Sequence, residues 1–197
     1  MNLQKTNIIY PVILKVPMGK QSLSGRNQVR FLKKYARQAV VASAQKTGSD
    51  FSIFEKDNDG VPLPSNGAFW SLSHKPEYVA GVISDSPVGI DVERIRPVQS
   101  SLLNRVVDDE ERKLAGTISD ALFYRFWTAK EAVLKAVGVG LKGLSQCKIH
   151  RIVDHSVMVV FYPQKYWMIE HAYYDNHVVS IIKEDHAVQW IFPVSGR

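Results

Sequence analysis

The sequence has little cysteine and no long apolar run, and both absences narrow the possible functions. Cys147 is the single cysteine among 197 residues, so an internal disulfide is excluded and a zinc site built on cysteines is disfavoured. No apolar run approaches the roughly 20 residues that cross a bilayer, and residues 1–20 do not have the pattern of a secretory signal. We therefore expect a cytoplasmic protein whose one thiol is buried or half-buried.

The charge balance is basic, with 25 Lys and Arg against 19 Asp and Glu and a formal net charge of +6. Such an excess favours an anionic partner, which could be nucleic acid, a phosphorylated cofactor or an acidic protein. The basic residues are densest within residues 26–37, at helical spacings of three and four. They form either an anion site or a solvated helix face, and they are Arg26, Arg30, Lys33, Lys34 and Arg37.

The order of the predicted elements indicates an α+β fold. We predict helices at residues 22–45, 101–107, 108–114 and 119–137, and strands at 8–16, 69–73, 78–84, 88–93 and several times within 144–193. Pro11 places the first strand at an edge or a bulge. This order predicts two similar α+β lobes in a pseudo-twofold arrangement, residues 1–88 and 89–197, with the ligand site in the cleft between them.

Residues 89–93, GIDVE, place two carboxylates on one face of a strand. Strand alternation sends Ile90 and Val92 to one side and Asp91 and Glu93 to the other, with the two acidic Cα atoms roughly 7 Å apart. Oxygen ligands without a nearby histidine or cysteine favour magnesium, with manganese possible, over zinc. The alternative is a charged strand end that protects a sheet edge.

Residues 126–141, FWTAKEAVLKAVGVGL, carry an acidic and a basic residue one turn apart in a predicted helix. Ser119 or Asp120 can cap the start of this helix, and Gly138 can end it. Glu131 and Lys135 lie opposite its apolar face, which is formed by Leu122, Phe126, Ala129, Val133 and Val137. They are either a surface ion pair worth about 0.2–0.5 kcal/mol or a third carboxylate with a cation for phosphate.

Residues 71–75, SLSHK, form the third segment of interest. At the end of a short strand, His74 can bind a phosphate oxygen while the hydroxyl of Ser73 donates a hydrogen bond. The alternative is a structural histidine. Lys75 is either a further ligand contact or a solvated turn residue.

These three segments, in this order, resemble the phosphopantetheinyl transferase superfamily of the longer, two-lobed Sfp type. The family pattern is a serine and a histidine at a strand end, then G-x-D-x-E, then W-x-x-K-E-A-x-x-K. The matching residues here are Ser73, His74, Gly89, Asp91, Glu93, Trp127, Lys130, Glu131, Ala132 and Lys135. The resemblance spans residues 71–141.

The resemblance implies a reaction and an assignment of roles. Members of the family move the phosphopantetheine arm of coenzyme A to a serine hydroxyl of an acyl or peptidyl carrier protein and release adenosine 3',5'-bisphosphate. Asp91, Glu93 and Glu131 would hold magnesium, and Glu131 would also be the base for the acceptor serine. Lys135 would stabilise charge on the transferring or leaving phosphate.

The resemblance also implies a set of cofactor contacts, which are Arg26, Arg30, Ser73, His74, Lys75, Lys130 and Lys135. Lys130 is either a ligand contact or a structural lysine. Relatives carry a G-K-P step before the serine-histidine pair, but this chain has Gly60, Val61 and Pro62. The valine removes one expected contact, which Lys56 or Lys75 would replace.

The segment between the second and third motifs, residues 94–118, is the expected surface for an acidic carrier protein. Its candidates, which otherwise pack between lobes or are solvated, are Arg94, Arg96, Leu102, Leu103, Arg105 and Val106. We expect a two-lobed monomer that binds neither membrane nor nucleic acid. The alternatives are another magnesium-dependent phosphoryl or nucleotidyl transferase and a non-catalytic nucleic-acid-binding protein, which would need a reading helix or a stacking platform.

Overall fold

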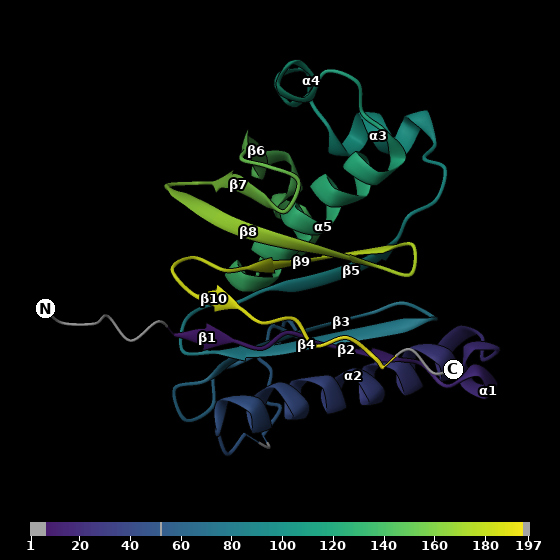
Figure 1. Ribbon diagram of the computed structural model, residues 1–197, viewed down its shortest axis with the longest axis vertical. Helices are drawn as coiled ribbons and strands as arrows, with labels where there is room; N and C mark the ends of the chain where they lie inside the picture. The colour runs from purple at the N-terminus through teal and green to yellow at the C-terminus, as the bar shows by residue number, and fades with distance from the viewer. Residues whose placement is uncertain (1–6, 52, 195–197) are drawn as a thin grey trace, which may run out of the picture.

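Two antiparallel β-sheets, each covered by one long helix, make up the fold (Figure 1). The structure is a computed structural model that describes residues 7–51 and 53–194. The smaller sheet consists, in spatial order, of β2 (Val12–Lys15), β4 (Tyr78–Ser84) and β3 (Phe69–His74). The larger sheet consists of β5 (Ile90–Arg94), β9 (His177–Ile182), β8 (Lys165–Tyr174), β7 (Val157–Tyr162) and β6 (Lys148–Ile152).

Four helices lie close to where the sequence places them, and two short helical segments, Met18–Gln21 and Gly140–Gln146, were not predicted. They are α1 (Met18–Gln21), α2 (Gly25–Thr47), α3 (Ser100–Val106), α4 (Asp109–Ala115), α5 (Asp120–Val137) and the 3₁₀ segment η1 (Gly140–Gln146). The Ser119 hydroxyl accepts from the Leu122 amide to cap α5, and Gly138 ends this helix in the left-handed conformation. The caps thus determine both ends of α5, as predicted.

The helix predicted from residue 22 is α2, which begins at Gly25, so its predicted start is wrong by three residues. Gly25 has a φ of 58°, which interrupts the helical run and leaves Met18–Gln21 as a separate turn. This turn buries no residue, so it lacks the apolar stripe by which sequence periodicity finds a helix.

The two sheets face each other across an apolar core. Ile13 and Val82 of the smaller sheet meet Ile90, Val92 and Ile181 of the larger one in this core. On the outer faces, α2 packs against β4 and α5 packs against β5 and β9. The layers are therefore helix, sheet, sheet, helix, and the alternation predicted for GIDVE is confirmed because Ile90 and Val92 lie between the sheets.

The last described strand returns to the beginning of the chain. β10 (Ala187–Val188) pairs in parallel with β1 (Ile8–Ile9), and Ile191 forms a bridge with Val12 (Figure 1). Pro11 lies at the break between β1 and β2, as expected for an edge or a bulge. The α+β class is confirmed, whereas the division of the chain at residues 88 and 89 stays a prediction. No helix in the described residues is both long and apolar enough to cross a bilayer.

Candidate active site

The three motifs meet where β3, β5 and α5 come together. β3 and β5 are edge strands of the two sheets, and α5 packs across β5. A Cβ atom added to Gly89 would lie 1.8 Å from the carbonyl oxygen of Ala132, so only glycine allows this approach of the backbones. The close contact brings the acidic face of GIDVE next to the polar strip of α5.

Asp91 is buried, with a relative exposure of 4%, and two donors hold one of its oxygens. The Ser73 hydroxyl donates to Oδ1 at 2.7 Å, and Lys135 Nζ donates to the same oxygen at 2.8 Å. The second oxygen, Oδ2, is buried and has no hydrogen-bond partner in the part of the chain that the structure describes. Asp91 therefore presents one fixed oxygen and one free oxygen.

Glu93 is held in a similar way. Lys75 Nζ lies 2.7 Å from Oε1, and Trp127 Nε1 donates to the same oxygen at 3.1 Å. Burial, followed by the charge of Asp91, raises the pKa of Glu93 above its ordinary value. The tryptophan of the third motif thus has a direct polar contact with the second motif.

Glu131 is half-buried on α5. Burial and the charge of Asp91 raise its pKa to about 7, against the attraction of Lys135. Glu93 contributes to the same increase. Asp91 and Glu93 thus lie close enough to Glu131 for their charges to act on it, while their role as joint ligands of one metal ion stays a prediction.

Lys135 connects the two sheets. Its Nζ donates to the carbonyl oxygen of Ile90 at 2.9 Å and to that of Leu72 at 3.4 Å, in addition to Asp91. Three acceptors account for the three hydrogens of an ammonium group. Lys135 therefore lies at the centre of the candidate site.

Two features of the site are compatible with a bound cation. An unpartnered buried carboxylate oxygen on Asp91 calls for an explanation. A cation would also offset the charge of Asp91, which, after burial, raises the pKa of Glu131. Within residues 7–51 and 53–194, no group of three His, Cys, Asp or Glu side chains is placed so that it could by itself cage a metal ion. Magnesium does not need such a cage, because one or two carboxylates, waters and substrate phosphates usually hold it.

Positively charged side chains lie close to His74 and Lys56, near the carboxylates of the candidate site. Burial and the charges of Lys135, Lys75 and Lys33 lower the pKa of His74, so its imidazole is neutral near pH 7. Partial desolvation and the charges of Lys33 and Arg37 likewise lower the pKa of Lys56. Cations that repel one another in the free protein are stabilised when an anion binds between them, so this group of side chains is suited to an anionic ligand.

A cavity of about 910 Å³ adjoins this cationic group. Loop residues 59–62, β3, the end of α5 and η1 line it. Its charged lining residues are three lysines and one aspartate, Lys56, Lys135, Lys142 and Asp59. A Cβ atom on Gly138 would lie 2.8 Å from Val61, so the valine that replaces the family lysine packs against the end of α5. Lys56 is thus the better placed of its two candidate substitutes, since Lys75 is paired with Glu93.

Arg26 and Arg30 are exposed on the first turns of α2. Neither forms an ion pair or a side-chain hydrogen bond with the site within the described ranges. Their assignment as cofactor contacts stays a prediction. The electrostatic effects on His74 and Lys56 point instead to the next two turns of the same helix, at Lys33 and Arg37.

Lys130 does not face the site. Its ammonium lies 2.6 Å from Glu111 Oε1 and donates at 2.6 Å to the carbonyl oxygen of Val106, and its side chain is only 2% exposed. Glu111 also accepts from the Ile149 amide. These contacts correct the ligand-contact interpretation of Lys130 in favour of the structural alternative, because a buried and paired ammonium cannot reach a ligand in the cavity.

The segment expected to meet a carrier protein divides into two kinds of residue. Leu102 and Leu103 pack against the apolar core under α5, and Val106 is buried. This arrangement favours the packing alternative for the apolar residues. The exposed arginines, Arg94, Arg96 and Arg105, remain candidates for the interface.

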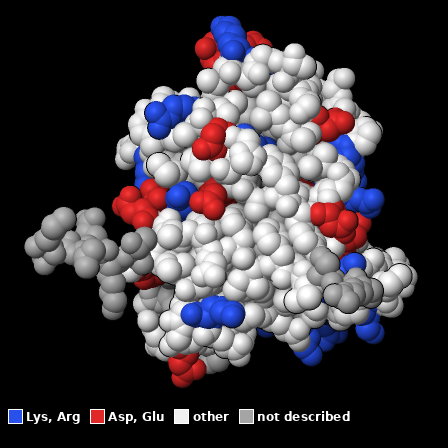
Figure 2. Space-filling model, viewed as in Figure 1, with Lys and Arg blue, Asp and Glu red and all other residues white. Residues whose placement is uncertain are grey.

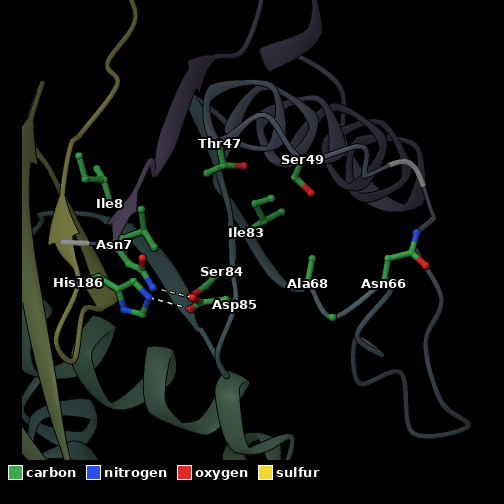
Figure 3. Close-up of a pocket in the computed structure, with 12 residues that line it drawn as sticks. Asn7, Ile8, Thr47, Ser49, Asn66, Ala68, Ile83, Ser84, Asp85 and His186 are labelled. Carbon is green, nitrogen blue, oxygen red and sulfur yellow. Dashed lines mark hydrogen bonds and ion pairs between the residues drawn. The ribbon is translucent and has the colours of Figure 1, made fainter. Parts of the chain in front are cut away.

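Two other features do not take part in the site. Burial raises the pKa of Cys147 to about 12, which keeps the thiol protonated and unreactive. A second cavity, of about 360 Å³, lies near β1 and β10 (Figure 3), where Asp85 accepts from Asn7 at 2.8 Å and from His186 at 2.9 Å. None of the motif residues lines this cavity.

On at least one face of the molecule, the lysine and arginine side chains do not form a patch. On the face shown in Figure 2, the middle is largely uncharged and side chains of both signs lie in scattered groups around it. This face therefore offers no continuous basic surface for a polyanion.

Sequence reasoning did not identify the partners that hold the acidic residues. The bond from Ser73 to Asp91 and the pairing of Lys75 with Glu93 depend on which strand edges meet. The buried partner of Lys130 could have been found from one local sequence pattern. The capping box of Asp108 and Glu111 places a buried glutamate near α5, and an Asp-x-x-Glu spacing before a helix is visible in the sequence.

Comparison with known proteins shows relatives of one kind. A family model described as the 4'-phosphopantetheinyl transferase superfamily matches residues 87–189. The 4'-phosphopantetheinyl transferase psf-1 of Bacillus pumilus is 36% identical over 102 residues, which are 47% of this chain and 43% of the relative. The 4'-phosphopantetheinyl transferase gsp of Aneurinibacillus migulanus is 31% identical over 93 residues, 45% of this chain and 39% of the relative.

A longer alignment reaches an animal protein. The L-aminoadipate-semialdehyde dehydrogenase-phosphopantetheinyl transferase of Xenopus laevis is 26% identical over 189 residues, which cover 80% of this chain and 63% of the relative. In the two bacterial alignments, the matched region spans less than half of the relatives' length. The residues of GIDVE and of the α5 motif lie inside the matched family region.

Proposed function

The chain belongs to the 4'-phosphopantetheinyl transferase superfamily, and on this premise we propose that it moves the phosphopantetheine arm of coenzyme A to a serine of an apo acyl or peptidyl carrier protein. Magnesium assists the reaction, and adenosine 3',5'-bisphosphate is the second product. The observation that carries the proposal is the joint environment of Asp91, Glu93 and Glu131, beside Lys135 and a cavity lined by cations.

Asp91, Glu93 and Glu131 would hold the magnesium ion. When bound, the ion supplies charge neutralisation of the coenzyme A diphosphate without any movement of protons. The free Oδ2 of Asp91 and the crowded negative charge at Glu131 support this assignment.

The cations of the site bind and orient the diphosphate. Lys135 and Lys75 are within reach of the carboxylates in the free protein, so an incoming diphosphate offers both ammonium groups a second anionic partner. Burial, with the surrounding positive charge, lowers the pKa of His74 and keeps its ring neutral, and its ring N–H donates to a phosphate oxygen. Lys56, with Lys33 and Arg37, binds the separate phosphate at the adenosine end.

Glu131 accepts the proton of the carrier serine as the hydroxyl oxygen bonds to the phosphorus of the arm. None of the residues described donates a hydrogen bond to Glu131 or forms an ion pair with it at contact distance, which supports its availability as a base. The bond from that phosphorus to the oxygen of the departing phosphate breaks. Lys135 stabilises the negative charge that develops on the leaving group.

The acceptor protein is proposed to be acidic. The exposed side chains of Arg94, Arg96 and Arg105 lie between the second and third motifs, and positive charge near a site accelerates the encounter with an acidic partner. This predicts that kcat/KM for the carrier falls as salt rises, with a smaller effect on kcat.

The experiment that tests the proposal is mass spectrometry of apo carrier proteins after incubation with the full chain, magnesium and coenzyme A. We expect the mass of at least one carrier to increase by one phosphopantetheine group, and EDTA to prevent the increase. Asp91→Ala should abolish it, whereas Asp50→Ala, which removes an exposed carboxylate after α2, should not. If no carrier is modified, although a known transferase modifies each of them, the proposal is wrong.

A further inference from the structure

The edges of the two sheets are joined by serine hydroxyls instead of a backbone ladder. Ser71 and Ser73, on β3, accept hydrogen bonds from the amides of Ile90 and Val92, on β5, at 3.1 and 3.3 Å. Both serines are buried. Each hydroxyl therefore satisfies one outward-pointing amide of an edge strand, which would otherwise be left without a partner.

The two serines differ in one contact. The Ser73 hydroxyl also donates to Asp91 Oδ1 at 2.7 Å, while no carboxylate accepts from Ser71 within the described residues. A serine hydroxyl has a single hydrogen to donate. In Ser73 this hydrogen goes to Asp91, so none remains for a phosphate oxygen, and only 6% of the residue is exposed.

The contacts of Asp91 are divided unequally between its two oxygens. Ser73 and Lys135 both donate to Oδ1, and Oδ2 has no partner among the residues described. A fixed carboxylate with one free oxygen is suited to hold a cation, because the rotation of the group is already restricted. Glu93 has the same arrangement, with Lys75 and Trp127 on one oxygen.

We propose that Ser73 is a positioning residue, which holds Asp91 by Oδ1 and leaves Oδ2 free for the divalent cation. The inference rests on the proposed function, because it concerns the magnesium site of that reaction. It differs from the role that the family resemblance implies, in which Ser73 contacts the diphosphate itself. Ser71 performs the same strand-joining task without touching Asp91, so it provides a matched control.

The test compares Ser73→Ala with Ser71→Ala in the full chain. Manganese, in the presence of coenzyme A, is the probe, and electron paramagnetic resonance measures the free and bound ion. We expect Ser73→Ala to weaken manganese binding about tenfold, as is usual for loss of a group that orients a metal ligand. Ser71→Ala should keep the affinity within about twofold of the wild type. Both variants should unfold at reduced temperatures, Ser73→Ala at the lower one, because it loses two bonds to β5 and Ser71→Ala loses one.

The outcomes separate the positioning role from the transferase reaction. Equal manganese affinities in the two variants would overturn the positioning role. A wild-type chain that binds no manganese would overturn both the metal site and the inference. A wild-type chain that binds manganese but modifies no carrier would refute the proposed reaction, and selective weakening in Ser73→Ala would still support the role of Ser73.

Discussion

Replacement of Glu131 by glutamine should stabilise the free protein at neutral and alkaline pH while it removes activity. Burial and the charge of Asp91 raise the pKa of Glu131 to about 7, from an ordinary value of 4.5. Between these two values the folded chain binds more protons than the unfolded chain, so the free energy of unfolding falls as pH rises. Glutamine carries no charge, so its burial does not lower the free energy of unfolding as burial of the ionised carboxylate does.

The size of the effect follows from the pKa difference. A shift of this size corresponds to roughly 3 kcal/mol at 1.36 kcal/mol per unit, and solvent screening of a half-buried group reduces it to about 1–2 kcal/mol. For a domain of this length, the melting temperature should rise by about 3–6 °C above pH 7. Below pH 4.5 the gain should vanish, since Glu131 is then protonated in both states.

Thermal unfolding of the metal-free chain from pH 4 to pH 8.5 measures this difference. Glu110→Gln removes an exposed carboxylate on α4 and should leave the pH dependence unchanged. The reasoning would be refuted if Glu131→Gln followed the wild-type curve at every pH. A gain that was largest at pH 4 would have the wrong sign and would refute it as well.

Three further predictions concern packing and ligand binding. Gly89→Ala should destabilise the chain by about 2 kcal/mol or more, measured by urea unfolding, because the added methyl would overlap the Ala132 carbonyl; an unchanged midpoint would contradict the close contact. Lys130→Met should cost about 3–5 kcal/mol by leaving the charge of Glu111 buried and unpaired; adding Glu111→Gln should recover part of that loss, and no recovery would argue against the pair. Lys56→Gln should weaken binding of adenosine 3',5'-bisphosphate about tenfold by calorimetry, with no loss for adenosine 5'-monophosphate; equal losses for both ligands would exclude a role at the 3'-phosphate.

Local rules predicted most of the fold. The helix at residues 120–137 could be predicted within about a residue at each end, because its caps and its apolar period are local properties. The orientation of Asp91 and Glu93 toward the same face follows from strand alternation alone. The return of residues 187–191 to the first strands could not be predicted, since nothing local in the sequence specifies a parallel partner so distant along the chain.

The candidate site could be predicted in its residues but not in its bonds. The carboxylates and Lys135 were identified by motif order, whereas the division of labour between the oxygens of Asp91 depends on where two sheet edges meet. The role of Lys130 was left open because its partner Glu111 lies on another helix, α4, and the sequence does not show how α4 packs against α5. Pairings of this kind are set by tertiary contacts and not by spacing.

The parallel pairing of Ile8 with Ala187 has a consequence for biosynthesis. During translation, β1 obtains this neighbour only after the chain has been made as far as residue 188, so until then the β1 amides that pair with β10 stay open to water. Closure of such a distant contact is entropically slow. We therefore expect β1 and β10 to join last, after each helix has docked on its own sheet.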